Sequence, residues 1–260
     1  MERMIEYYTA SDAYAEFLQR CDRAEYKPYV DMFRHFVKPA EGQVLDVGCG
    51  VGTSTVMLRH RGFEAIGADV SPRFLPANLP GFIVADFSNA HQVADNTYTA
   101  AGCHDVIEHI EEPLKFLAEM VRVVKPGGLV LVHAPNLTSP VVAARVVVDN
   151  LLGRTPYLGI NNLIESVRLF LSSFWHCWQA KSGLDAFRMR KPRLETGIVC
   201  YDADAVYWTN PAEIRRFLES QGCEICHYQR MGRSWGARLI ANFAPNFAGQ
   251  ICIVARKGNA

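Results

Sequence analysis

The chain has 260 residues, of which 49% are apolar, and its 27 basic side chains equal its 27 acidic ones. This length and apolar content suit one large domain with a substantial core, and the even charge excludes a global field that would draw the protein to nucleic acid or an anionic membrane. Because residues 1–6 lack the basic start and continuous apolar core of a signal peptide, we expect a soluble, cytoplasmic protein without a membrane span.

Two helical patterns with an aromatic-rich face occupy residues 5–37, with a break around residues 21–25. The simplest interpretation is a helix pair that packs on a sheet, and a contact between its aromatic face and a ligand is the alternative. We therefore expect residues 1–38 to form a helical cover within a single domain that spans residues 1–260.

A buried strand, a glycine-rich turn and the start of a helix are predicted in residues 43–52. Gly48, Gly50 and Gly52 let the main chain take positive φ and approach a ligand closely, and the N–H groups of the following helix favour a negative group. Asp46 adds a carboxylate beside the turn. The spacing differs from the dinucleotide fingerprint, in which the third glycine comes one residue later. A purely structural strand–helix turn is the alternative.

The next two predicted strands also end in carboxylates. Residues 63–69 end at Asp69, and residues 82–87 end at Asp86 and Phe87. Because ligands bind at the carboxyl ends of parallel strands, Asp69 is placed beside the glycine turn, where it can accept two hydrogen bonds from a ribose diol. Asp86 can accept from an exocyclic amine, and Phe87 offers a ring face or a backbone N–H to an adenine.

A further strand–helix–strand unit follows, with strands predicted at residues 98–105 and 129–134 and a helix from residue 112 to 124. Several polar residues fall at the same sheet edge: His104, Asp105, Glu108, His109, His133 and Asn136. Among them, His109 is the candidate general base, because the histidine side chain in general suits removal of a proton from a hydroxyl or amine nucleophile. The alternative is that His109 caps the following helix or orients a loop.

Together these motifs resemble the class I S-adenosylmethionine-dependent methyltransferases, in the small-molecule branch with an Asp-x-x-Glu-His element. The stretches that carry the resemblance are residues 44–52, 67–71, 85–87, 103–109 and 117–136. The resemblance implies an α/β fold with a doubly wound, mostly parallel seven-stranded sheet whose final strand is reversed. It also implies S-adenosylmethionine as cofactor and in-line methyl transfer to a small-molecule acceptor, as O- or N-methylation.

The same resemblance names the residues expected to bind the cofactor. They are Asp46, Gly48, Cys49, Gly50, Gly52, Asp69, Val70, Asp86, Phe87 and Asp105. Because the N-terminal helices of such families often cover the cofactor, Tyr7, Tyr8 or Tyr14 could touch its methionine end or the acceptor. The predicted chemistry requires no metal, and the eight scattered cysteines indicate core thiols rather than a metal site.

A long insertion is expected at residues 137–207, with helical patterns at 141–152 and 162–178. It is predicted to be a helical lid or binding element. Its aromatic side chains could line an acceptor pocket, but core packing and a homodimer contact are together favoured: Phe170, Phe174, Trp175 and Trp178. Its apolar composition slightly favours an apolar or aromatic acceptor. The basic run at residues 188–193 is interpreted first as a solvated loop.

The C-terminal part is predicted to contain a well-capped helix at residues 209–222 and strands at 223–230 and 250–256. Two other functions remain open from the residues alone. One is a nicotinamide-dependent oxidoreductase on a similar sheet, which the glycine spacing disfavours. The other is a non-catalytic module that binds S-adenosylmethionine and acts through the insertion.

Overall fold

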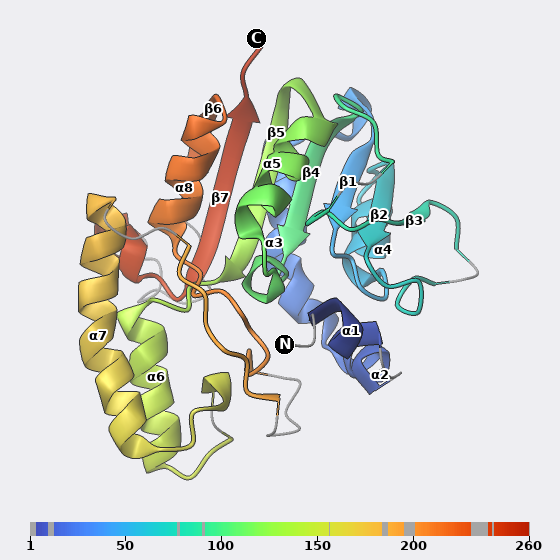
Figure 1. The fold of residues 1–260 in the computed structure, drawn as a ribbon. Helices are drawn as coiled ribbons and strands as arrows, with labels where there is room; N and C mark the ends of the chain where they lie inside the picture. Colours follow the sequence, from blue (N-terminus) through green and yellow to red (C-terminus); the bar gives the residue numbers. More distant parts are fainter. Residues whose placement is uncertain are drawn as a thin grey trace.

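A seven-stranded sheet forms the centre of the chain in the computed structural model, with the strand order β3-β2-β1-β4-β5-β7-β6 (Figure 1). The strands are β1 (Val44–Val47), β2 (Ala65–Asp69), β3 (Phe82–Val84), β4 (Tyr98–His104), β5 (Val124–Pro135), β6 (Cys223–Tyr228) and β7 (Gln250–Lys257). β1 to β5 pair in parallel, whereas β7 is antiparallel to both of its neighbours. The predicted doubly wound, mostly parallel sheet with a reversed final strand is confirmed.

The structure describes residues 4–9, 13–76, 79–89, 92–155, 157–183, 187–194, 201–229, 239–240 and 242–259. Its helices are α1 (Met4–Thr9), α2 (Ala13–Arg20), α3 (Arg23–Phe36), α4 (Thr53–His60), α5 (Pro113–Val123), α6 (Pro140–Leu151), α7 (Leu163–Ser182) and α8 (Pro211–Ser220). Short 3₁₀ turns are η1 (Pro39–Glu41), η2 (Ile107–His109), η3 (Tyr157–Gly159) and η5 (Pro245–Phe247).

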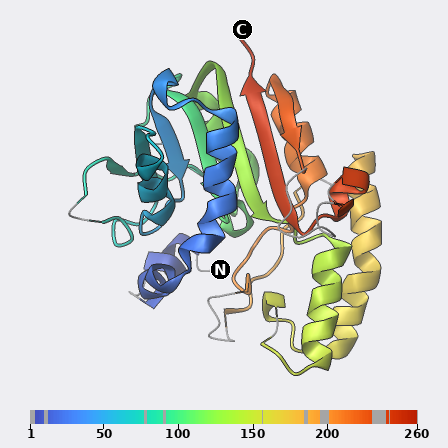
Figure 2. The same cartoon turned by 180° about the vertical axis from the view of Figure 1, so that it is seen from behind.

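Helices cover both faces of the sheet, which explains why its inner strands are apolar throughout. α5 and α8 pack on one face, and α3 and α4 pack on the other, where α3 crosses the rear of the sheet (Figure 2). Val44, Leu45 and Val47 of β1 are consequently all 2% exposed or less. Each face thus contributes its own apolar core, and together they fix the strand ends that carry the site.

Side-chain caps set the beginnings of several helices. Asp22 accepts a hydrogen bond from Ala24 N at the start of α3, and Ser139 accepts from Val141 N at the start of α6. Asn162 and Asn210 do the same for α7 and α8. These residues satisfy N–H groups that have no partner within the helix, as their types predict.

Three boundaries differ from the sequence prediction. β5 begins at Val124, five residues before the predicted start, because Val124 already pairs with Tyr98 of β4. β3 ends at Val84, so the acid and aromatic after it lie in a loop. The N-terminal segment forms three helices rather than two. The predicted end of the β6 strand at Arg230 lies outside the described residues.

The basic run at residues 188–193 is not simply a solvated loop. Arg190 donates to the carbonyls of Leu158 and Asp202, and Arg193 donates to the carbonyl of Gly159. The first interpretation of this run was therefore wrong for these two arginines, whose planar donor groups hold the main chain of the insertion together.

The two additions to the sheet lie at the carboxyl ends of its strands. α1 and α2 sit beneath β1 and β4, and the α6–α7 pair projects below β5 and β7 (Figures 1 and 2). No helix in the described part of the chain is long and apolar enough to cross a membrane. The predicted location in the cell is not tested by the fold.

The contact between β4 and α3 gives a stability prediction. A Cβ at Gly102 would lie 2.7 Å from Phe33 Cε2 and from the Tyr29 hydroxyl, so Gly102→Ala should lower the free energy of unfolding by about 1–3 kcal/mol through overpacking. Denaturant unfolding would measure the change. A matched control is Gly249→Ala, whose Cβ would meet Val142 at an ordinary 3.6 Å. Equal effects of the two substitutions would contradict the prediction.

Candidate active site

A cavity of about 730 Å³ lies at the carboxyl ends of β1, β2 and β4. This volume is in the range of small-molecule sites. The sheet contributes the glycine turn, Asp69 and the loop after β4, and the N-terminal helices contribute Tyr8 and Tyr14. The insertion adds Arg145 and Tyr157. The cavity thus joins three parts of the chain that are distant in sequence.

The glycine turn is tied to the end of β2. The N–H groups of Gly48 and Cys49 both donate to the carbonyl of Ala68, at 2.7 and 3.0 Å, and Gly50 N donates to Asp69 Oδ2 at 2.8 Å. Gly48 and Gly50 have φ values of +71° and +52°, which glycine adopts without strain. These three N–H groups therefore hold the turn in place, and what the turn presents to the cavity is a main chain without side chains.

Asp46, predicted to bind the cofactor, is not among the residues that line the cavity. It is 1% exposed, and its carboxylate accepts hydrogen bonds from the hydroxyls of Tyr29, Ser54 and Thr55 at 2.8, 2.6 and 2.6 Å. Burial raises the pKa of Asp46, and the three hydroxyls oppose this rise by stabilising the charged form. Asp46 therefore braces β1 against α3 and α4.

Gly52 is also outside the cavity lining. It begins α4 with φ +82°, and a Cβ there would lie 2.7 Å from the ring of Phe82. The helix start and the packing against Phe82 explain the need for glycine at this position, and its predicted role in cofactor binding stays a prediction.

Asp69 is the buried carboxylate closest to the turn. It is 7% exposed, accepts from Gly50 N and Ser71 N, and lines the cavity next to Val70. Burial raises the pKa of Asp69 to about 6, against the opposing effect of the backbone donors. A carboxylate offers about four lone-pair positions, so Asp69 can accept further hydrogen bonds from a ligand.

Three other predicted residues line the cavity in different settings. Cys49 is buried, and burial raises the pKa of its thiol well above the usual range, so the side chain is an uncharged filler. Asp86 is half-buried and accepts from Ser88 N at 2.8 Å. Phe87 is buried against Phe116, with ring centroids 6.4 Å apart. Their roles toward an adenine remain predictions.

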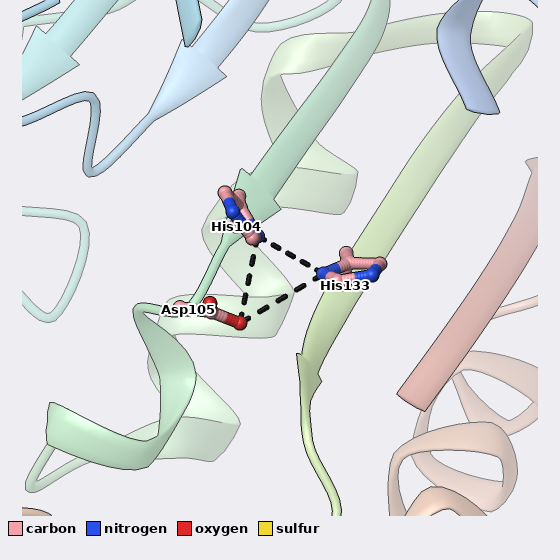
Figure 3. A group of neighbouring side chains, drawn as sticks. All are labelled: His104, Asp105 and His133. Carbon is pink, nitrogen blue, oxygen red and sulfur yellow. Dashed lines mark hydrogen bonds and ion pairs between the residues drawn. The ribbon is translucent and has the colours of Figure 1, made fainter. Parts of the chain in front are cut away.

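A histidine pair fixes the end of β4. His104 Nδ1 lies 3.0 Å from His133 Nδ1, and Asp105 Oδ1 lies 3.5 and 3.8 Å from these two atoms (Figure 3). Burial raises the pKa of Asp105, but the two imidazoles lower it further, and the net shift is downward. Asp105 is therefore held as a carboxylate at the cavity wall, in a left-handed conformation with φ +51°.

His109 lies at the opposite end of the cavity within a polar network. Its Nδ1 is 3.0 Å from the hydroxyl of Tyr8, which in turn donates to Asp204 Oδ2 at 2.8 Å. Because the single hydroxyl proton points to Asp204, the network assigns a proton to His109 Nδ1 and leaves a lone pair on Nε2. Glu108 Oε1 lies 3.8 Å from Nε2.

Buried carboxylates surround this histidine. Glu108 is 0% exposed, and neither of its carboxylate oxygens has a hydrogen-bond partner in the described structure. Burial, followed by the charges of Asp105 and Asp202, raises the pKa of Glu108 well above its usual range. Burial therefore favours the neutral form of the Glu108 carboxyl group beside His109.

Two groups of these side chains have donor atoms of the kind that bind metal ions. The groups are His104, Asp105 and His133, and Glu108, His109 and Asp202, with ligand atoms within 4.8 Å of one another in each. Imidazole and carboxylate suit divalent cations in general. The chemistry predicted from the sequence needs no such ion, and neither group is assigned one.

Sequence reasoning missed the contribution of the insertion to this site. Tyr201 and Asp202 line the cavity in consecutive left-handed conformations, with φ +62° and +54°, and Tyr157 donates to Asp202. Strained non-glycine backbone of this kind clusters at functional sites. Neither of these two positions is a glycine or an asparagine, so the usual sequence signal for this conformation is absent. Phe174, Trp175 and Trp178, for which an acceptor pocket was the less favoured alternative, are exposed on α7 and outside the cavity lining.

Comparison with known proteins places this site in a family context. Residues 45–132 match the protein family described as "Methyltransferase domain". The "Ubiquinone biosynthesis O-methyltransferase" of Cereibacter sphaeroides is 33% identical over 108 residues, which cover 38% of this chain and 43% of that protein. The "Demethylmenaquinone methyltransferase" of Renibacterium salmoninarum is 36% identical over 95 residues, 35% of this chain and 40% of that protein.

A solved structure extends the similarity of fold to almost the whole chain. The magnesium protoporphyrin IX methyltransferase of Synechocystis, with bound SAH, superposes with a TM-score of 0.56 at 13% identity and covers 97% of both chains. At this identity the match supports the fold alone. The chain spans less than half the length of the two relatives above, and the matched part contains the glycine turn, Asp69 and His109.

The hydrogen bonds of Asp46 give a prediction that separates bracing from ligand contact. Asp46→Ala leaves three buried hydroxyls without their acceptor, and the free energy of unfolding should fall by about 2–4 kcal/mol. Denaturant unfolding of the ligand-free protein would measure it. Asp31→Ala, at a surface ion pair on α3, is the control and should change stability by less than about 0.5 kcal/mol. Unchanged stability of the Asp46 variant would contradict the bracing role.

Proposed function

We propose that residues 45–132 form a class I S-adenosylmethionine-dependent methyltransferase domain, and that the chain as a whole transfers the methyl group of this cofactor to a small-molecule acceptor. One observation carries the proposal. A single cavity runs from the glycine turn and Asp69 to His109, so a cofactor site and a proton acceptor share one enclosed space. The match of residues 45–132 to a methyltransferase family also favours methyl transfer over the nicotinamide alternative.

The residues of the cavity fit the cofactor. Gly48 and Gly50 line the cavity, and their lack of Cβ atoms leaves room for the side chains of Val106 and Leu18 beside the turn. Asp69 is fixed by two backbone donors and keeps lone pairs for the two hydroxyls of a ribose. Asp86 and Phe87 lie at the neighbouring strand end, where we place the adenine. Asp105 is a charged acceptor suited to the amino group of the methionine end.

The protein's part in the reaction is to position the acceptor, exclude water and remove a proton. When bound, S-adenosylmethionine supplies a methyl group on a positively charged sulfur, a good leaving group. Nε2 of His109 would accept the proton that the acceptor hydroxyl gives up when it is methylated. Tyr8 and Asp204 hold the imidazole through Nδ1 and stabilise its protonated form.

The acceptor end of the cavity favours an aromatic molecule that bears a hydroxyl group. Its walls include the rings of Tyr8, Tyr14, Phe74 and Tyr157, which suit a flat apolar ring. The names of the two relatives refer to ubiquinone and demethylmenaquinone, which are quinone-type molecules. We therefore propose a phenol or hydroquinone acceptor and O-methylation, in which the general base has a proton to remove.

Calorimetric titration tests the cofactor assignment. S-adenosylmethionine and S-adenosylhomocysteine should bind, NADH should not, and Asp69→Ala should weaken binding by about 100-fold because two hydrogen bonds to a carboxylate are lost. Asp31→Ala should leave the affinity unchanged, since Asp31 lies outside the cavity lining. Binding of NADH alone, or of none of the three by folded protein, would refute the proposal.

The same titration has a pH dependence with a defined sign. The pKa of Asp69 is about 6 in the free protein, and hydrogen bonds from a bound ligand favour its charged form. Protonation therefore competes with binding, so affinity should be constant above pH 7 and fall as the pH drops through 6. Asp69→Asn, which cannot ionise, should lose this component of the pH dependence.

His109 gives the catalytic prediction. With a hydroquinone acceptor that the titrated protein turns over, His109→Gln should lower kcat by about 100- to 10,000-fold and leave the affinity for S-adenosylhomocysteine within about twofold. His60→Gln, at the exposed end of α4, is the matched control and should be neutral. Unchanged kcat in the His109 variant would exclude the general-base role. Failure of every acceptor with the wild type, despite cofactor binding, would favour the non-catalytic binding module.

A further inference from the structure

The large apolar side chains of α7 point outward, away from the rest of the molecule. α7 lies at the outer edge, with α6 on its inner side (Figures 1 and 2). Besides Leu163 at the start of the helix, the exposed large apolar side chains are Ile164, Val167, Leu171, Phe174, Trp175 and Trp178, each between 39 and 66% exposed. A surface helix normally buries its large apolar residues and exposes polar ones. A contiguous apolar surface made of several large exposed side chains marks an interaction site.

The inner face of the same helix is built from small residues. Ser166, Ser173, Cys177 and Ala180 are all 4% exposed or less, and Cys177 reaches the carbonyl of Thr138. These residues let α7 pack closely on its neighbours, together with Leu169 and with Phe174, whose ring centroid lies 5.8 Å from that of Phe247. The small inner residues therefore leave most of the large apolar side chains of α7 on its outer face.

The outward residues follow the spacing of a helix–helix seam. Positions 164, 167, 171, 174 or 175, and 178 alternate steps of three and four, which keeps them in one stripe along a partner helix. The stripe contains no carboxylate. Glu165, the one acidic residue of α7, lies outside the stripe positions and is paired with Arg193. A helix of matching apolar pattern is the partner that fits this face.

The sequence of the stripe is complementary to itself. If two copies of α7 meet antiparallel about a two-fold axis at Leu171, Ile164 of each copy faces Trp178 of the other, and Val167 faces Trp175. Each small aliphatic side chain is then opposite a large aromatic one. Arg168 falls opposite Phe174, where a cation–π contact is favourable. A two-fold interface requires this kind of self-complementary surface.

We propose that the outward face of α7 joins two copies of this chain in a symmetric dimer centred on Leu171. Six side chains that each lose on the order of 100 Å² would bury about 1,200 Å² over both copies, within the size range of specific interfaces. The stripe residues are outside the cavity lining, so the dimer leaves the proposed active site open. The proposal is independent of the proposed function.

Substitutions that place a charge on the two-fold axis test the proposed dimer. Leu171→Asp and Leu171→Lys each bring two like charges together at the centre of the interface, and each should raise the dimer dissociation constant by about 100-fold or more. An equimolar mixture of the two variants should form the dimer again, because opposite charges then meet. Sedimentation velocity would measure the association state of the full chain in these three samples and in the wild type.

Leu114→Asp is the matched control, since Leu114 is a similarly exposed leucine on α5 and this variant should remain dimeric. Circular dichroism would establish that each variant is folded, and Leu171 is 65% exposed, so its substitution should not unfold the chain. A monomeric wild type, a dimer that survives both substitutions, or a mixture that stays monomeric would overturn the proposal. Flotation of a monomeric wild type with phosphatidylglycerol vesicles would assign the face to a lipid surface instead.

Discussion

The site depends on the hydrogen bonds that join the glycine turn to the end of β2. Ala68 accepts from two N–H groups of the turn, and Asp69 accepts from a third. These bonds fix the path of the main chain between β1 and α4 and orient the Asp69 carboxylate in the same step. A turn without Cβ atoms and a buried acceptor are therefore positioned together, and Asp46 braces the turn from beneath through three hydroxyl groups.

The sheet could be predicted from the sequence because its signals are local. Apolar runs such as Val44 to Val47, each followed by glycine or an acid, identify buried parallel strands and their carboxyl ends. Asp69 and His109 were placed correctly at the cavity for this reason. The reversed direction of the last strand was predicted from the family resemblance, since residues alone do not specify whether a strand is parallel or antiparallel to its neighbour.

Long-range contacts account for what the sequence could not predict. Asp46 occupies a motif position at which a ligand contact is expected. The orientation of its side chain is set by hydrogen bonds from Tyr29 of α3 and from two hydroxyl groups of α4. Likewise, Asp202 and Asp204 are brought to His109 because the main chain of Val206 and Tyr207 binds the carbonyl of Glu108. No periodicity or spacing encodes such a contact across about a hundred residues.

The insertion combines two roles in separate surfaces. Its inner side supplies Arg145, Tyr157 and Asp202 to the acceptor end of the cavity, whereas the outer side of α7 carries the apolar stripe. The most direct test of the proposed cofactor site is a crystal structure of the protein with S-adenosylhomocysteine. We expect the ribose hydroxyls to donate to Asp69 and the sulfur to be directed toward His109. A ligand bound elsewhere, or with its ribose away from Asp69, would contradict this site.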